Sequence, residues 1–193
     1  MPTNFTDQNE LILIGENPWM TVFQDPDDQP TTHVSAWTVT LSPAGPGHAL
    51  FWRSELTNGE PRIYSDNIAL ARWLQSELIG NNLPYKSSDL PVVEAQFSRA
   101  GSLPWFITEH VEAPGEILEF TWYDFLDSFS GRSDPDAGDT HGHSACYVPA
   151  RQVRVTLNGR EAAGQPVARE RDGYQWTSCF LALAESWVRM RQR

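Results

Sequence analysis

The sequence predicts a mainly β protein, an antiparallel β-barrel with one inserted α-helix near residues 66–79. Aromatic and β-branched residues concentrate in short segments that are typical of strands. Turn signals recur every ~8–15 residues, a spacing that favours an antiparallel barrel or sandwich. Only one segment has clear helical spacing of its apolar residues. The chain of 193 residues is short enough for one domain, which we place at 1–193.

The expected strands are separated by loops rich in glycine, proline and asparagine. Asn158-Gly159 is the clearest two-residue hairpin signal, because both residues tolerate the positive φ of a type I′ turn. Asp172-Gly173 is a second signal of this kind. The main strand segments are 31–41, 48–57, 92–98, 105–112, 117–127, 152–157 and 174–188.

The expected helix places four apolar residues on one face. Ser65 or Asp66 would accept the free amides at its start. Gly80 would end it, since glycine readily adopts a left-handed conformation. We expect the apolar face to pack against the sheet; it consists of Leu70, Trp73, Leu74 and Leu78.

Charge and composition exclude several classes of partner. Fourteen basic and twenty-five acidic residues give a net charge of −11, which repels the phosphate backbone of nucleic acids. No apolar run approaches the ~18 residues of a membrane span, and no signal peptide is visible at the N-terminus. The two cysteines, Cys146 and Cys179, favour a reducing compartment over a disulfide scaffold. We therefore expect a cytoplasmic protein without a nucleic-acid or membrane partner.

Familiar cofactor and nucleophile motifs are missing from the sequence. It contains no glycine-rich dinucleotide fingerprint, no phosphate loop and no Gly-x-Ser-x-Gly elbow. A nucleotide cofactor and a covalent-nucleophile hydrolase are therefore disfavoured. We expect no cofactor.

His141-Gly142-His143 resembles the His-x-His element of a cupin metal site. Alternate histidines on a strand share one face and can bind a transition metal. The resemblance covers only these residues, because no glutamate follows at the cupin spacing and no histidine follows His143. Asp139 or Cys146 could complete a site, whereas solvated loop histidines are the simpler interpretation. We expect no bound transition metal.

The segments 105–112 and 117–127 form an expected hairpin that carries two acids. With an even loop at Pro114-Gly115, Glu109 lies opposite Phe120 and Ile107 opposite Trp122, while Trp105 lies opposite Asp124. A carboxyl group on this apolar face would have a raised pKa and could act as a general acid or base. In one alternative, a three-residue loop puts the face of His110, Thr108 and Phe106 inward instead. In another, one or both acids lie at strand ends and are simply solvated.

A second expected hairpin, 31–41 with 48–57, places Trp37 opposite Arg53, with His33 further along the same face. If this face points inward, Arg53 could hold a carboxylate or phenolate while Trp37 stacks on the ligand. If it points outward, its charges form surface pairs that contribute little.

The expected architecture is loosely similar to the lipocalin or calycin type, a small barrel that can hold one ligand. We predict a cofactor-independent enzyme, such as a lyase, hydratase, isomerase or cyclase, that acts by acid–base chemistry on a small apolar or aromatic molecule. A non-catalytic binding or carrier barrel is the alternative, and a metal-dependent cupin-like enzyme is a more distant one. The expected catalytic residues are Asp124, Glu109 and His33, and the expected ligand-binding residues are Trp37, Arg53, Trp105, Phe120 and Trp122.

Overall fold

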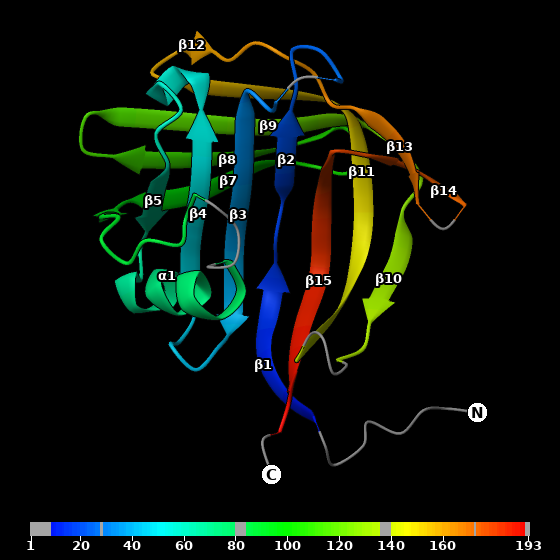
Figure 1. Cartoon of the computed structure of the whole chain (residues 1–193). Helices are drawn as coiled ribbons and strands as arrows, with labels where there is room; N and C mark the ends of the chain where they lie inside the picture. The colour runs from blue at the N-terminus through cyan, green and yellow to red at the C-terminus, as the bar shows by residue number, and fades with distance from the viewer. Residues whose placement is uncertain (1–8, 28, 80–83, 136–139, 172, 192–193) are drawn as a thin grey trace.

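A computed structural model describes residues 9–27, 29–79, 84–135, 140–171 and 173–191. Most of these residues lie in strands, with one α-helix (Figure 1). The first strands are β1 (Asn9–Glu16), β2 (Trp19–Val22), β3 (Thr32–Leu41), β4 (Gly47–Ser54), β5 (Arg62–Ser65), β6 (Val92–Glu94) and β7 (Gln96–Ser102). They are followed by β8 (Phe106–Ala113), β9 (Glu116–Phe125), β10 (Phe129–Ser133), β11 (His141–Leu157), β12 (Arg160–Glu161), β13 (Ala168–Arg171), β14 (Tyr174–Thr177) and β15 (Cys179–Met190). The helical elements are a 3-10 turn (Glu55–Thr57), α1 (Ile68–Leu74) and a π-helical turn (Gln75–Ile79).

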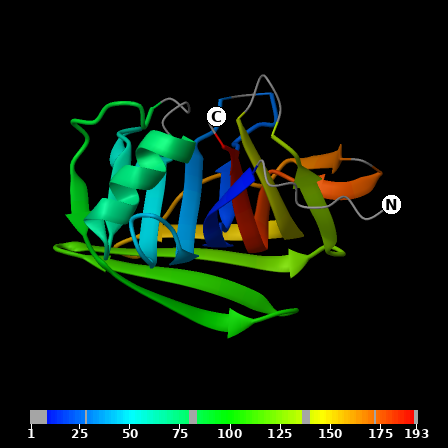
Figure 2. The same ribbon diagram turned by 90° about the horizontal axis from the view of Figure 1, so that it is seen from below.

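Thirteen of the described strands belong to one sheet, which folds into two layers. The hydrogen-bonded order is β6-β5-β4-β3-β1-β15-β11-β9-β8-β7. All pairs are antiparallel except β5 with β6. Strands β7, β8 and β9 cross behind the others (Figure 1) and form the smaller layer. The larger layer lies between them and α1, as Figure 2 shows from below.

Strand β11 connects the two layers. Its first part, His141 to Pro149, pairs with β15 in the larger layer. Its second part, from Ala150 to Leu157, pairs with β9 in the smaller layer. The change of partner occurs at Pro149, which has no backbone N–H to donate. One continuous strand therefore fixes how the layers lie on each other.

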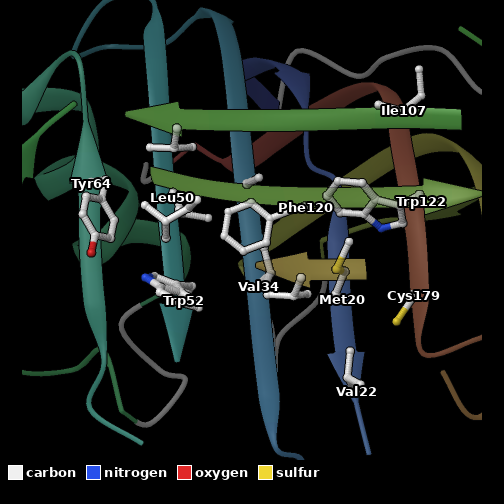
Figure 3. Close-up of a cluster of buried hydrophobic side chains, with 14 of the residues drawn as sticks. Met20, Val22, Val34, Leu50, Trp52, Tyr64, Ile107, Phe120, Trp122 and Cys179 are labelled. Atoms are coloured by element: carbon white, nitrogen blue, oxygen red, sulfur yellow. The ribbon is translucent and has the colours of Figure 1, made fainter. Parts of the chain in front are cut away.

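Apolar side chains from both layers fill the space between them (Figure 3). Trp52 and Leu50 come from β4, and Phe120 and Trp122 come from β9; all four have no exposed surface. The Trp52 and Phe120 rings meet edge to face, with centroids 5.7 Å apart. The interior of the folded sheet is thus occupied by its own side chains.

The helix covers part of the opposite face of the larger layer. Leu70 and Leu74 are completely buried there, whereas Trp73 and Leu78 are only half-buried. Asn67 caps the helix by accepting a hydrogen bond from the Leu70 amide, at 3.2 Å. Neither expected cap is the N-cap residue: Ser65 Oγ accepts a hydrogen bond from the Asn67 amide at 2.9 Å, and the Asp66 carboxylate lies 2.6 Å from His48 Nδ1.

The mainly β fold with one helix near residues 66–79 is therefore confirmed. Two strands, β1 and β2, precede the first expected strand, and β10 begins after the end of the expected strand 117–127. The Asn158-Gly159 hairpin is confirmed: it joins β11 to β12, and both residues have positive φ. Both cysteines are free. No helix in the described part of the chain is long and apolar enough to cross a membrane.

The two expected hairpin registers have different outcomes. The even loop at Pro114-Gly115 is confirmed, with Glu109 opposite Phe120 and Ile107 opposite Trp122. The register of β3 with β4 is wrong by four residues, because Trp37 lies opposite Ala49 and Arg53 lies opposite His33. The turn comes earlier than expected: Ser42 Oγ donates to the Gly45 carbonyl at 2.7 Å, and β4 begins at Gly47.

We expect Leu74→Ala to lower the free energy of unfolding by about 2–5 kcal/mol, because it leaves a cavity under the helix. Trp73→Ala should cost less than the roughly 3–5 kcal/mol of a fully buried tryptophan, since its ring is half-buried. Urea denaturation of both variants measures this order. A larger loss for Trp73→Ala would mean that the helix presents a different face to the sheet.

Candidate functional site

The sequence-predicted site residues lie in three separate places. Glu109, Phe120 and Trp122 point into the space between the layers. Asp124 and Trp105 lie at the surface. The remaining three, Trp37, His33 and Arg53, lie on the helix-bearing face of the larger layer, because they alternate along β3 and β4 with residues of the inter-layer core. The structure therefore does not assemble the expected pocket.

Glu109 is buried, but its carboxylate is already held by an arginine. The guanidinium of Arg99 donates to Glu109 Oε1 from Nε at 2.7 Å, and its Nη2 lies 2.6 Å from the same oxygen. The guanidinium also donates to Glu16 at 2.5 Å. Burial raises the pKa of Glu109 more than Arg99 lowers it. Its environment is thus that of a structural ion pair between the layers.

Asp124 and Trp105 do not face each other. The β8–β9 ladder ends at Phe106 opposite Tyr123, and Trp105 is 74% exposed. The exposed Asp124 has a φ of 54°, and its carboxylate accepts a hydrogen bond from Arg151 at 3.1 Å. The left-handed backbone turns this residue out of the ladder, which corrects the expectation that it projects into an apolar pocket.

A chain of aromatic rings crosses the helix-bearing face of the larger layer beyond α1. We call this surface the aromatic face; its rings belong to Trp19, His33, Tyr85, Phe129, Tyr147, Trp176 and Phe180. In Figure 1, α1 lies in front of β3 and β4, and no helix of the described chain lies in front of β2, β15, β11 and β10. The helix therefore leaves this part of the sheet for the rings to cover.

Trp19 lies at the centre of the aromatic face. It pairs with Ser35 on one side and with Phe180 on the other. Its ring stacks on Phe180 with centroids 6.2 Å apart and meets the edge of His33 at 4.5 Å. Trp19, His33 and Phe180 are half-buried. Each ring is thus mostly packed and keeps a smaller exposed surface that a planar ligand can contact.

His33, Tyr85 and Arg53 form a polar group at one end of the aromatic face. His33 Nδ1 lies 3.4 Å from the Tyr85 hydroxyl, and His33 is directly opposite Arg53. Burial, aided by the positive charge of Arg53, lowers the pKa of His33 to about 4. Burial also raises the pKa of Tyr85 well above its ordinary value. Near neutral pH, both His33 and Tyr85 are uncharged beside the Arg53 cation.

A second group on the same face contains the buried carboxyl of Glu185. Glu185 Oε1 accepts a hydrogen bond from Trp187 Nε1 at 2.9 Å, while its Oε2 has no hydrogen-bond partner in the described structure. The residue is 3% exposed, and burial raises its pKa to about 8. The Trp187 ring lies 6.4 Å from that of Trp37. Near neutral pH, Glu185 is therefore a mostly protonated acid that lies among aromatic rings.

The two groups are separated along the sheet. Phe180 pairs with Trp19, whereas Glu185 follows five residues later on β15 and pairs with Gly15. Five strand residues span about 16 Å. One small molecule therefore cannot lie against Trp19 and reach Glu185 at the same time.

His141 and His143 lie on β11 and not in a loop, as the simpler interpretation had placed them. His141 Nε2 is 3.1 Å from Glu77, and His143 Nε2 is 2.9 Å from the Tyr147 hydroxyl. The described residues contain no group of three or more acidic, histidine or cysteine side chains that could hold a metal ion. Asp139, a possible further ligand, lies outside the described residues.

Two grooves adjoin the edge where β6 leads into β7. One, of about 820 Å³, is lined partly by Asp66, Glu94 and Glu112. The other, of about 540 Å³, has apolar walls from Ile63, Leu90, Pro91 and Val93. In this second groove, which we call the Tyr64 groove, the Tyr64 hydroxyl donates to Glu116 at 2.6 Å and Arg62 donates to the same carboxylate.

Sequence reasoning missed Trp19, Tyr85 and Glu185. Trp19 follows Pro18 in a segment without an alternating pattern, and Tyr85 lies in a loop, so neither had a detectable signal. Glu185 did have one, because it is the only carboxyl in the expected strand 174–188. A single acid in an otherwise apolar strand is a candidate for a shifted pKa.

The chain matches no model of a known protein family, no curated protein and no solved structure.

We expect Glu185→Gln to change how stability depends on pH. The pKa of Glu185 is 4.5 ordinarily and about 8 in the folded protein, so the folded state binds more protons between these values. Its contribution to the free energy of unfolding therefore falls as pH rises through this range. Urea denaturation at about pH 5 and about pH 9 measures this. Between the two pH values, the free energy of unfolding should decline less for Glu185→Gln than for the wild type.

Glu112→Gln is the matched control, because Glu112 is exposed. This variant should keep the decline of the wild-type protein. The same decline in Glu185→Gln would contradict the assignment of a raised pKa to Glu185.

Proposed function

We propose that this protein binds a small aromatic molecule on the aromatic face, with the ligand ring against Trp19 and Phe180. The observation that carries this proposal is the stacked pair of half-buried rings beside the polar group of His33, Tyr85 and Arg53. Rigid aromatic side chains bind planar ligands with little loss of conformational entropy. Binding without catalysis agrees with the low pKa of His33, which makes it a weak base.

We also propose that the sheet closes into a barrel of the lipocalin or calycin type. Strands β6 and β7 are the two ends of the hydrogen-bonded order, and Ala95 alone separates them in the chain. This short connection supports a sheet that curls back on itself. The ligand is placed outside this curl because Trp52, Phe120 and Trp122 occupy the inside.

Calorimetric titration with 2-naphthoate, a planar aromatic acid, tests the proposal. We expect saturable binding, and Trp19→Ala should weaken it about 10-fold or more, since stacking on one aromatic ring contributes ~1–3 kcal/mol in comparable sites. Trp19→Phe should retain most of the affinity because it keeps a ring. A thermal melt of each variant establishes that it is folded.

Val93→Ala is the control, because Val93 lines the Tyr64 groove, the other place where the ligand could bind. This variant should bind 2-naphthoate with the affinity of the wild type. Binding that resists Trp19→Ala but is lost in Val93→Ala would move the ligand to the Tyr64 groove, and the absence of any saturable binding would refute the proposal.

A second candidate function is the cofactor-independent acid–base enzyme, and Glu185 is the observation that favours it. A carboxyl that is mostly protonated near neutral pH and has one oxygen without a partner can donate a proton to a bound molecule. Here Glu185 takes the role that the sequence analysis gave to Asp124 and Glu109. Phenylpyruvate is a suitable probe: proton donation from Glu185 to its keto oxygen would let water remove a CH₂ proton, and the reverse reaction in D₂O would return a deuteron to that carbon.

We expect this enzyme to incorporate deuterium from D₂O into phenylpyruvate faster than buffer does, and Glu185→Gln to slow the exchange ~10²-fold or more. Nuclear magnetic resonance measures the exchange directly. Exchange at the buffer rate would leave the binding function as the better proposal.

A further inference from the structure

We propose that the ligand of the aromatic face carries a carboxylate and that Arg53 binds it. This inference rests on the binding function proposed above. Arg53 lies on β4 directly opposite His33, on the same face of the sheet. The His33 ring contacts Trp19 at 4.5 Å. A ligand ring against Trp19 can therefore direct an acidic group toward the guanidinium.

Arg53 differs from the other half-buried arginines of the described chain. Those arginines each donate to a named acceptor: Arg62 to Glu116, Arg72 to the Leu90 carbonyl at 2.7 Å, and Arg189 to Glu77 at 2.8 Å. Arg53 is also half-buried, yet it makes no hydrogen bond or ion pair with any described residue. Its donors remain available to a ligand.

The neighbours of Arg53 do not neutralise its charge. His33 is uncharged near neutral pH, because burial and Arg53 itself lower its pKa to about 4. Tyr85 is also uncharged, because the ordinary pKa of a tyrosine hydroxyl lies well above neutral pH, and burial raises the pKa of Tyr85 further. Arg53 therefore presents a full positive charge beside aromatic rings, in a protein whose net charge is −11.

The chemistry of the site favours a carboxylate over other anions. A guanidinium matches the two oxygens of a carboxylate with two parallel hydrogen bonds. Polyanions such as nucleotides are repelled by the strongly negative protein more than a monovalent acid is. A monovalent aromatic acid requires only one guanidinium and gains stacking on Trp19 as well.

Calorimetric titration with 2-naphthoate and 2-naphthamide tests this inference, because the two probes share a shape and differ in charge. The wild type should bind 2-naphthoate about 10- to 100-fold more tightly, as expected for a charge-assisted pair. Arg53→Gln should abolish the preference while keeping the affinity for 2-naphthamide. Arg53→Lys retains the charge but not the two parallel donors, so it should show an intermediate preference.

Arg160→Gln is the matched control, since it removes one positive charge at an exposed residue of β12. It should keep the full preference for 2-naphthoate. Equal affinity of the wild type for the two probes, or a preference that survives in Arg53→Gln, would overturn the role of Arg53 and leave the proposed function intact. If neither probe binds, the proposed function fails and the inference fails with it.

Discussion

The arrangement of this protein depends on β11, the strand that belongs to both layers of the sheet. Its first part is held by β15 and its second part by β9. Because one continuous strand is hydrogen-bonded in both layers, the direction of β11 sets how the smaller layer crosses the larger one. The crossing lets Trp52 and Leu50 of one layer meet Phe120 and Trp122 of the other. Burial of these large side chains contributes to the stability of the fold.

The filled space between the layers determines where a ligand can bind. Since the inner side is occupied by side chains, functional groups are left on the outer face of the larger layer and at its edges. The helix covers one part of that outer face through Leu70 and Leu74. Away from these two leucines, the face carries half-buried rings next to Arg53 and, further along the sheet, the buried acid Glu185. Leu70 and Leu74 of α1 pack with Trp37 of β3 and Ala49 of β4. The His33 and Arg53 positions of these strands are thus left to the part of the face that we propose to be functional.

Local patterns in the sequence predicted much of the fold but only part of the candidate site. The alternation of apolar residues and the turn residues predicted the β8–β9 register, because the two-residue loop and the apolar face both indicate the same pairing of the strands. The β3–β4 register was wrong because the turn is fixed by contacts from outside the hairpin: the Asn67 side chain donates to the carbonyls of Ala44 and Pro46. His33 and Arg53 were assigned to one face, which is confirmed, whereas their neighbours Trp19 and Tyr85 come from segments without periodicity. The contacts of Asn67 with the turn, and of Trp19 and Tyr85 with His33, depend on the tertiary structure, so no pattern in the neighbouring sequence predicts them.

The most direct test of the account is nuclear magnetic resonance of the tryptophan indole N–H groups during titration with 2-naphthoate. Trp19 lies on the aromatic face, while Trp52 and Trp122 lie in the inter-layer core. We predict that the Trp19 signal shifts with increasing 2-naphthoate and that the Trp52 and Trp122 signals stay in place. Shifts of Trp52 or Trp122 without a shift of Trp19 would contradict it, because they would place the ligand between the layers or in the neighbouring Tyr64 groove.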